Sequence, residues 1–130
     1  MRNLKYIIIN DELPKAGGGK SNNHTTDNLG HHYVINSKGQ VLNPIDVCQP
    51  GNFMPAPARG AEDLNQCSIG IKYNGKLSNS RLRPLLIALL LHLRDRHPDA
   101  KILAKDEYDR YQIKVRSDMN GLRRELSDWP

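Results

Sequence analysis

The stretch KYIIINDELP, Lys5 to Pro14, decides how the rest of the chain can be arranged. Its run from Tyr6 to Ile9 is short, β-branched and almost continuously apolar, which is typical of a buried strand. The run stops at the polar residues Asn10 and Asp11. Loops at strand ends are common places for binding and catalysis. We therefore expect a buried strand that delivers Asn10 to the edge of a functional site.

The length of the chain, 130 residues, suits one compact domain covering residues 1–130. No apolar run approaches the ~18 residues that a membrane span needs. The start, MRNLKYIII, is too short and enters a strand too soon for a signal peptide. We expect a cytoplasmic protein with no membrane contact. Cys48 and Cys67 form no metal-binding pattern; they could pair, but two free buried thiols are expected.

The chain carries a net charge of +5, and some of the excess lies at Arg81/Arg83 and Arg123/Arg124. Surplus Lys and Arg attract phosphates, nucleic acid or acidic cell-wall polymers. A solvated basic surface is the alternative interpretation. The few aromatic residues argue against a stacking platform for single-stranded nucleic acid.

Glycine and proline divide the next part of the chain. The polar stretch after the first strand is a predicted loop, and Gly17 to Ser21 has only the ending of a phosphate-binding loop. His31 to Ile35 predicts a strand, with a turn at Gly39 and a return over residues 40–42. Residues 43–66 contain several prolines and predict an irregular surface segment.

A second buried strand is predicted in CSIGIKYNG, residues 67–75. Strand alternation places Ile69 and Ile71 on one face of the sheet and Gly70 and Lys72 on the other.

The long helix is predicted over residues 84–96, with Pro84 in its first turn. Its apolar stripe is wide and comprises Leu85, Leu86, Ile87, Leu89, Leu90, Leu91 and Leu93. Such a face predicts burial against the sheet plus a second contact, either deeper in the core or with another subunit in a homo-oligomer.

A strand from Lys101 and a final helix capped by Ser117 complete the pattern. The inward residues of that helix are expected to be Met119, Leu122 and Leu126. The fold class is therefore α/β, with a single mixed β-sheet flanked by helices.

The order YIIIND, GHHYVINSKGQVLNPI, SIGIKYNG, helix, ILAKDEY and IKVRSDMNGLRREL resembles the type 2 N-acetylmuramoyl-L-alanine amidases. That family includes amidase-type phage lysozymes and the animal peptidoglycan recognition proteins. The most specific pieces are Gly30 to Ile35 and Ser68 to Ile71. The resemblance covers most of the chain and implies an amidase-like fold. It also implies one zinc ion, held by two histidines and a third ligand, that activates water against an amide.

Matched by motif, the family's three zinc-ligand positions fall on Asn10, on Lys105 and near Arg110. Asparagine is a poor zinc ligand, and a protonated Lys or Arg repels the ion. His31 stands where the family has a tyrosine thought to assist catalysis. His31 and His32 are adjacent on the predicted strand, so they are expected on opposite faces. We expect a degenerate zinc amidase without a metal cofactor.

Fixed cations at strand ends, beside imidazole and amide donors, suit an anion such as a phosphate or carboxylate. The alternative is that the cations pair with the neighbouring acids Asp106, Glu107 or Asp109. The predicted ligand-binding residues are Asn10, His31, Arg59, Lys105 and Arg110, with Tyr108 and Tyr111 as stacking or hydrogen-bonding walls.

The expected function is a non-catalytic binder, a pseudoenzyme that captures a small anionic ligand in the former zinc cleft. A phage-encoded sponge that sequesters a nucleotide signal, such as a cyclic nucleotide, is its concrete form. One alternative is a binder of muramyl peptides or peptidoglycan fragments. Another is an amidase that hydrolyses the MurNAc-L-Ala amide with unorthodox ligands. Metal-free cleavage by His31, with Lys105 stabilising charge, is a further alternative.

Overall fold

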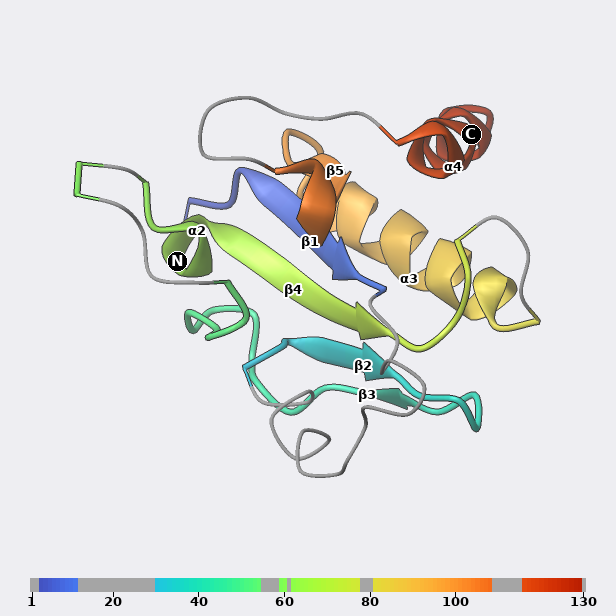
Figure 1. Cartoon of the computed structure of the whole chain (residues 1–130), viewed down its shortest axis with the longest axis horizontal. Coiled ribbons are helices and arrows are strands. Elements are labelled where there is room, and N and C mark those ends of the chain that lie inside the picture. The colour runs from blue at the N-terminus through green and yellow to red at the C-terminus, as the bar shows by residue number, and fades with distance from the viewer. Residues whose placement is uncertain are drawn as a thin grey trace.

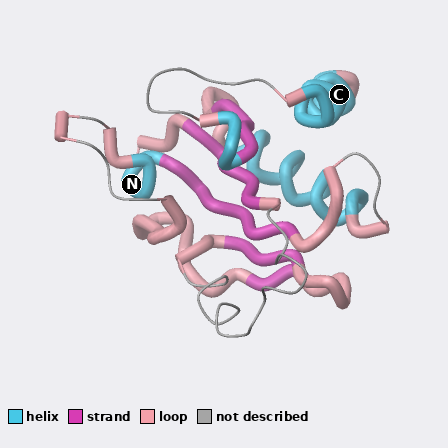
Figure 2. Tube along the Cα trace, viewed as in Figure 1, coloured by secondary structure: helices cyan, strands magenta, loops and turns pink. Residues whose placement is uncertain are grey.

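The structure is a computed structural model that describes residues 3–11, 30–54, 59–60, 62–77, 81–108 and 116–129. Within these ranges five strands form one mixed sheet in the order β3-β2-β4-β1-β5 (Figures 1 and 2). The strands are β1 (Tyr6–Asn10), β2 (Tyr33–Ile35), β3 (Val41–Leu42), β4 (Ser68–Tyr73) and β5 (Lys101–Ala104). The helices are α2 (Leu64–Cys67), α3 (Arg83–Arg96), the 3₁₀ turn η2 (Lys105–Glu107) and α4 (Ser117–Ser127). The predicted α/β class, with a single mixed sheet and flanking helices, is confirmed.

The direction of the strands decides which residues meet. β1 pairs in parallel with both β4 and β5, and β2 pairs in parallel with β4. Only β3, which returns from the turn at Gly39 (φ +83°), is antiparallel to its neighbour. Because β1, β2, β4 and β5 run the same way, their carboxyl ends share one edge. Asn10 ends β1 and Lys105 follows β5, so both lie at that edge.

The two faces of the sheet are covered differently. Ile7, Ile9, Ile69 and Ile71 belong to the main core together with α3 and α4, and we call this side the helical face (Figure 1). The other side, which we call the loop face, carries a smaller apolar cluster of Ile8, Phe53, Leu64 and Cys67. The predicted alternation along β4 is therefore confirmed.

Helix α3 begins one residue before the predicted start and ends at Arg96, with Pro84 in its first turn. Its wide apolar stripe packs on the helical face and also against α4, whose Met119, Leu122 and Leu126 point inward as predicted. The second contact that the stripe predicts is thus made at least in part within the chain. No helix in the described ranges is long and apolar enough to cross a bilayer.

Three local predictions are wrong. Arg116, and not Ser117, is the N-cap of α4, because Arg116 keeps an extended backbone (φ −99°, ψ 140°) while its N–H is held by the Glu107 carboxylate. Cys48 is exposed rather than buried, although both thiols are free as expected. The proline-bearing segment ends in the short helix α2, which Asp63 caps by accepting a hydrogen bond from the N–H of Asn65.

Candidate functional site

The candidate site on the loop face is built on the ring of Phe53. Gly70 leaves the space for this ring, because a Cβ at Gly70 would lie 2.6 Å from it. Asn65 in α2 fixes the loop: its side-chain oxygen accepts hydrogen bonds from the N–H groups of Phe53 (2.9 Å) and Met54 (3.0 Å). The sheet therefore carries an aromatic platform across β4.

His31 lies on this platform. Gly30 adopts φ +87° and accepts a hydrogen bond from the N–H of Asn52 at 2.9 Å, a close approach that leaves no room for a side chain at Gly30. The His31 ring then stacks on Phe53, with centroids 5.6 Å apart and an interplanar angle of 28°. Its Nε2 lies 3.4 Å from the amide nitrogen of Asn10. His31 is only 4% exposed.

The second ring nitrogen of His31 has no hydrogen-bond partner among the described residues. An amide nitrogen can only donate, so with Asn10 in this orientation Nε2 accepts and the neutral ring carries its proton on Nδ1. Nδ1 is buried, and no described group lies within hydrogen-bonding distance of it. A buried polar group without a partner costs about 1–3 kcal/mol. An acceptor atom of a ligand would remove that cost.

Two lysines give this region a positive charge. Lys72 is paired with Asn10 in the β1–β4 register and is 4% exposed, and Lys105 follows β5 and is partly exposed. Burial, followed by the charges of Lys72 and Lys105, lowers the pKa of His31 from 6.5 to about 4. His31 is therefore a neutral donor at pH 7 in a positive field. We call Asn10, His31, Lys72 and Lys105 the basic cluster.

The acids next to Lys105 are engaged elsewhere. Asp106 accepts from Arg116 at 2.9 Å, and the fully buried Glu107 carboxylate is held by both terminal nitrogens of Arg123. Burial alone would raise the pKa of Glu107, but hydrogen bonds from Arg123 and from backbone N–H groups lower it. No described acid forms an ion pair with Lys105. The alternative prediction is therefore wrong where it pairs Lys105 with Asp106 or Glu107, and where it concerns Asp109 or Arg110 it stays a prediction.

Of the other predicted ligand-binding residues, the structure describes Arg59 and Tyr108 but not Arg110 or Tyr111. Arg59 is exposed in a turn, and no hydrogen bond or ion pair joins it to another described residue. Tyr108 is partly buried, with its ring edge-on to Tyr6 at 5.9 Å and 73°. Arg110 and Tyr111 lie outside the described residues, as do Asp109 and the glycine-rich segment 17–21.

The expectation that His31 and His32 face opposite sides is wrong. β2 begins only at Tyr33, so the two histidines lie before the regular strand, and both rings contact Phe53. His32 has a structural role: its Nδ1 accepts from the N–H of Gly70 at 3.0 Å, and its Nε2 then donates to the carbonyl of Gln49 at 2.7 Å. Both of its nitrogens are used.

The side chains at the positions matched to zinc ligands do not fit zinc. Asn10 turns its amide nitrogen toward His31, and Lys72 and Lys105 bring positive charge to the same place. Zinc needs deprotonated or neutral nitrogen, sulfur or carboxylate ligands. In the described part of the chain, no three His, Cys, Asp or Glu side chains are grouped so that they could hold a metal ion.

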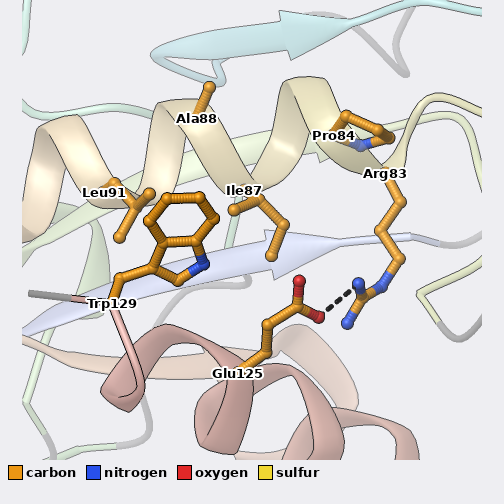
Figure 3. A pocket seen from close by; sticks show the side chains of 7 residues that line it. All are labelled: Arg83, Pro84, Ile87, Ala88, Leu91, Glu125 and Trp129. Carbon is orange, nitrogen blue, oxygen red and sulfur yellow. Dashed lines mark hydrogen bonds and ion pairs between the residues drawn. The ribbon is translucent and has the colours of Figure 1, made fainter.

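A pocket of about 290 Å³ lies away from the basic cluster, between α3 and the end of α4 (Figure 3). Its rim carries the Arg83–Glu125 ion pair and the half-exposed Trp129. The apolar part of its lining comes from α3, through Pro84, Ile87, Ala88 and Leu91. The homo-oligomer expected through residues 84–96 stays a prediction, and light scattering that finds only monomers would contradict it.

Comparison of the chain with known protein families, with curated proteins and with solved structures found no match. The chemistry of the basic cluster therefore carries the functional argument.

Proposed function

We propose that this chain is a non-catalytic ligand-binding protein on an amidase-like sheet, and that the basic cluster binds a small anion through its oxygen atoms. In its concrete form the protein is a phage-encoded cytoplasmic sponge for a nucleotide signal. The observation that carries the proposal is the buried, unpartnered Nδ1 of His31. It lies in a field set by the charges of Lys72 and Lys105.

The arrangement favours acceptor oxygens over other ligand chemistry. His31 offers an N–H, and the Lys105 ammonium, which no described acid pairs, offers charged donors. Hydrogen bonds between charged donors and phosphate or carboxylate oxygens are about twice as strong as neutral ones. A phosphoryl or carboxylate group would therefore satisfy His31 and offset the charge of Lys105 together.

The amidase-like part of the proposal is supported by where two motif-matched residues lie. Asn10 and Lys105 are far apart in the sequence, but β1 and β5 are neighbours and deliver both to one edge of the sheet. In the family that the sequence resembles, these positions hold zinc. Replacing a cation by fixed protein charges keeps a site that attracts anions while removing the activated water.

The test is a thermal-shift panel on the purified, metal-stripped protein. The wells contain cyclic mono-, di- and trinucleotides, muramyl dipeptide, longer wall fragments and, separately, zinc. A ligand at one hundred times its Kd stabilises a protein by about 2.7 kcal/mol, which is visible in a domain of this size. Stabilisation by one nucleotide class supports the sponge. Stabilisation by wall fragments alone, or by zinc alone, contradicts it and favours a peptidoglycan binder or an amidase.

The site is tested by reversing the charge of Lys105. Lys105→Glu should weaken binding of the stabilising ligand by about ten- to a hundredfold, the range expected when a charged hydrogen bond is lost. Lys101→Glu is the matched control, because the exposed Lys101 begins the same strand at its opposite end. Equal affinities of the two variants would show that the ligand does not use the basic cluster.

A further inference from the structure

Arg116 joins the chain segments that follow β1 and β5, at the edge of the sheet that carries Asn10 and Lys105. Its guanidinium group contacts both carboxylate oxygens of Asp11, at 3.1 and 3.0 Å, and one oxygen of Asp106 at 2.9 Å. It also holds Asp118 in the first turn of α4, at 3.0 and 2.6 Å. Asp11 directly follows Asn10, and Asp106 directly follows Lys105. Arg116 thus forms ion pairs with Asp11 and Asp106, the acids that follow two members of the basic cluster in the sequence.

These acids are natural competitors for Lys105. A lysine ammonium on its flexible four-carbon stem pairs readily with a neighbouring carboxylate, and such a pair would cancel the charge offered to an anion. The planar guanidinium of Arg116 uses its five N–H donors on the carboxylate oxygens of Asp11, Asp106 and Asp118, more than the three donors of a lysine could reach. Hydrogen bonds that Arg116 donates to the Asp11 and Asp118 carboxylates raise its pKa and keep it charged. Glu107, next in the chain, is engaged by Arg123 in the same manner.

We propose that Arg116 is a positioning residue that keeps Lys105 available to an anionic ligand by engaging Asp11 and Asp106. The inference rests on the proposed function, because it concerns the same site. It assigns Arg116 no contact with the ligand. It explains how Lys105 can lie next to Asp106 and Glu107 in the sequence without forming an ion pair with either of them.

The test measures binding of inorganic phosphate by NMR titration of the His31 ring signals at pH 7. Arg116→Gln should weaken binding by about tenfold, because the released carboxylates can pair with Lys105. Removing those carboxylates as well, in Arg116→Gln/Asp11→Asn/Asp106→Asn, should restore the affinity to near that of the unmodified protein. The exposed Arg124 of α4 supplies the control, since Arg124→Gln removes the same charge and should leave binding unchanged.

A restored affinity distinguishes a positioning role from a purely structural one. If Arg116 only stabilised the fold, the triple substitution would destabilise the protein further and would not restore binding. If the unmodified protein and Arg116→Gln bind phosphate with equal affinity, the inference is overturned and the proposed function is not. Weak binding by both the single and the triple variant also overturns it. Absence of phosphate binding by the unmodified protein overturns the proposed function together with the inference.

If circular dichroism shows that Arg116→Gln does not fold, Arg116→Lys takes its place. An ammonium has three N–H donors and cannot replace the five hydrogen bonds that Arg116 makes to these carboxylates, so phosphate affinity should fall and then recover when Asp106→Asn is added. An unchanged affinity in Arg116→Lys, or a loss that Asp106→Asn does not recover, overturns the inference.

Discussion

The two faces of the sheet bury different kinds of side chain. On the helical face, β1 and β4 contribute only apolar or aromatic side chains, and α3 and α4 cover them. On the loop face, the same two strands bury Asn10, Ser68 and Lys72 among the described residues, next to a small apolar cluster. The polar groups are thus not scattered through the interior. They are segregated by the alternation of side chains along each strand.

This difference teaches where stability and binding reside. Burial of aliphatic side chains under α3 stabilises the fold and needs no specific partner. On the loop face, burial of Asn10, His31 and Lys72 costs free energy unless each polar group is satisfied. Among the described residues, His31 Nδ1 on this face is a buried polar atom without a hydrogen-bond partner, which is the kind of group that costs stability. The comparison predicts that substitutions on the two faces separate stability from binding.

The largest expected effect is on the helical face. Leu90 of α3 is fully buried in the main core, and Leu90→Ala should lower the free energy of unfolding by about 2–5 kcal/mol through lost burial and a cavity. The phosphate affinity of the folded fraction should not change. Urea denaturation measures the first quantity and NMR titration the second. A large loss of phosphate affinity in a fully folded sample of the variant would mean that the two faces are coupled.

Acid should act mainly through the loop face. The pKa of His31 in the folded protein is about 4, below its ordinary 6.5, because of burial and the charges of Lys72, Lys105 and His32. The unfolded chain therefore takes up the proton first as pH falls. Stability falls from about pH 6.5 through about pH 4, by about 3 kcal/mol in total at 1.36 kcal/mol per pKa unit. The lowered pKa of Glu107 adds a loss of the same sign at lower pH.

The pH effect is measured by urea denaturation at pH 7, 5.5 and 4, with NMR titration of the His31 ring alongside. His31→Gln should flatten the dependence above pH 4. His92→Gln, which removes an exposed histidine of α3, should leave the dependence as it is. Equal slopes for the two variants would contradict the assignment to His31.

A smaller effect tests the platform under His31. Gly70→Ala places a Cβ 2.6 Å from the Phe53 ring, and the ring must move to admit it. Overpacking of this kind costs about 1–3 kcal/mol, and displacement of Phe53 should also shift the His31 ring signals. A stable variant with unchanged His31 signals would show that Phe53 does not position His31.

The smallest effect is the matched control on α4. Gly121 is exposed within the helix, and a Cβ there would meet nothing within 4 Å. Gly121→Ala should therefore stabilise the protein by about 0.5–1 kcal/mol through higher helix propensity. Replacing glycine by alanine is thus expected to lower the stability of the protein at Gly70 and to raise it at Gly121. Thermal unfolding of both variants in one buffer measures the contrast.

The elements that sequence predicts well are those with strong local patterns. β1 follows from the apolar run Tyr6 to Ile9, α3 from its leucine stripe after Pro84, and the turn from Gly39. The α2 helix was missed because four residues carry too little periodicity to register. Ser117 is a good N-cap by residue type, but a tertiary hydrogen bond from the N–H of Arg116 to Glu107 decides the helix start.

Part of the candidate site could also be predicted, because it follows from the pattern of strands in the sequence. Asn10 and Lys105 come together because parallel strands share an edge, which the order of strands already implies. Phe53 was missed because a loop residue's position depends on contacts such as that with Asn65, which no local pattern encodes. Lys72 sits inside an apolar strand, and its place opposite Asn10 requires the register of β4. Arg116 meets Asp11 across 105 residues of sequence.

The strand order also has a consequence for synthesis on the ribosome. The partners of β1 are β4 and β5, which the chain supplies only after residues 68 and 101. At about 5–20 residues per second, the apolar side chains of β1 wait for roughly 5–20 s before both neighbours have been made. Until β4 has been made, Ile7, Ile8 and Ile9, all fully buried in the finished fold, have neither native strand partner, and the side facing β5 stays unpaired until that strand follows. The nascent chain therefore presents a segment suited to chaperones that bind short apolar stretches, and slower translation would prolong its exposure.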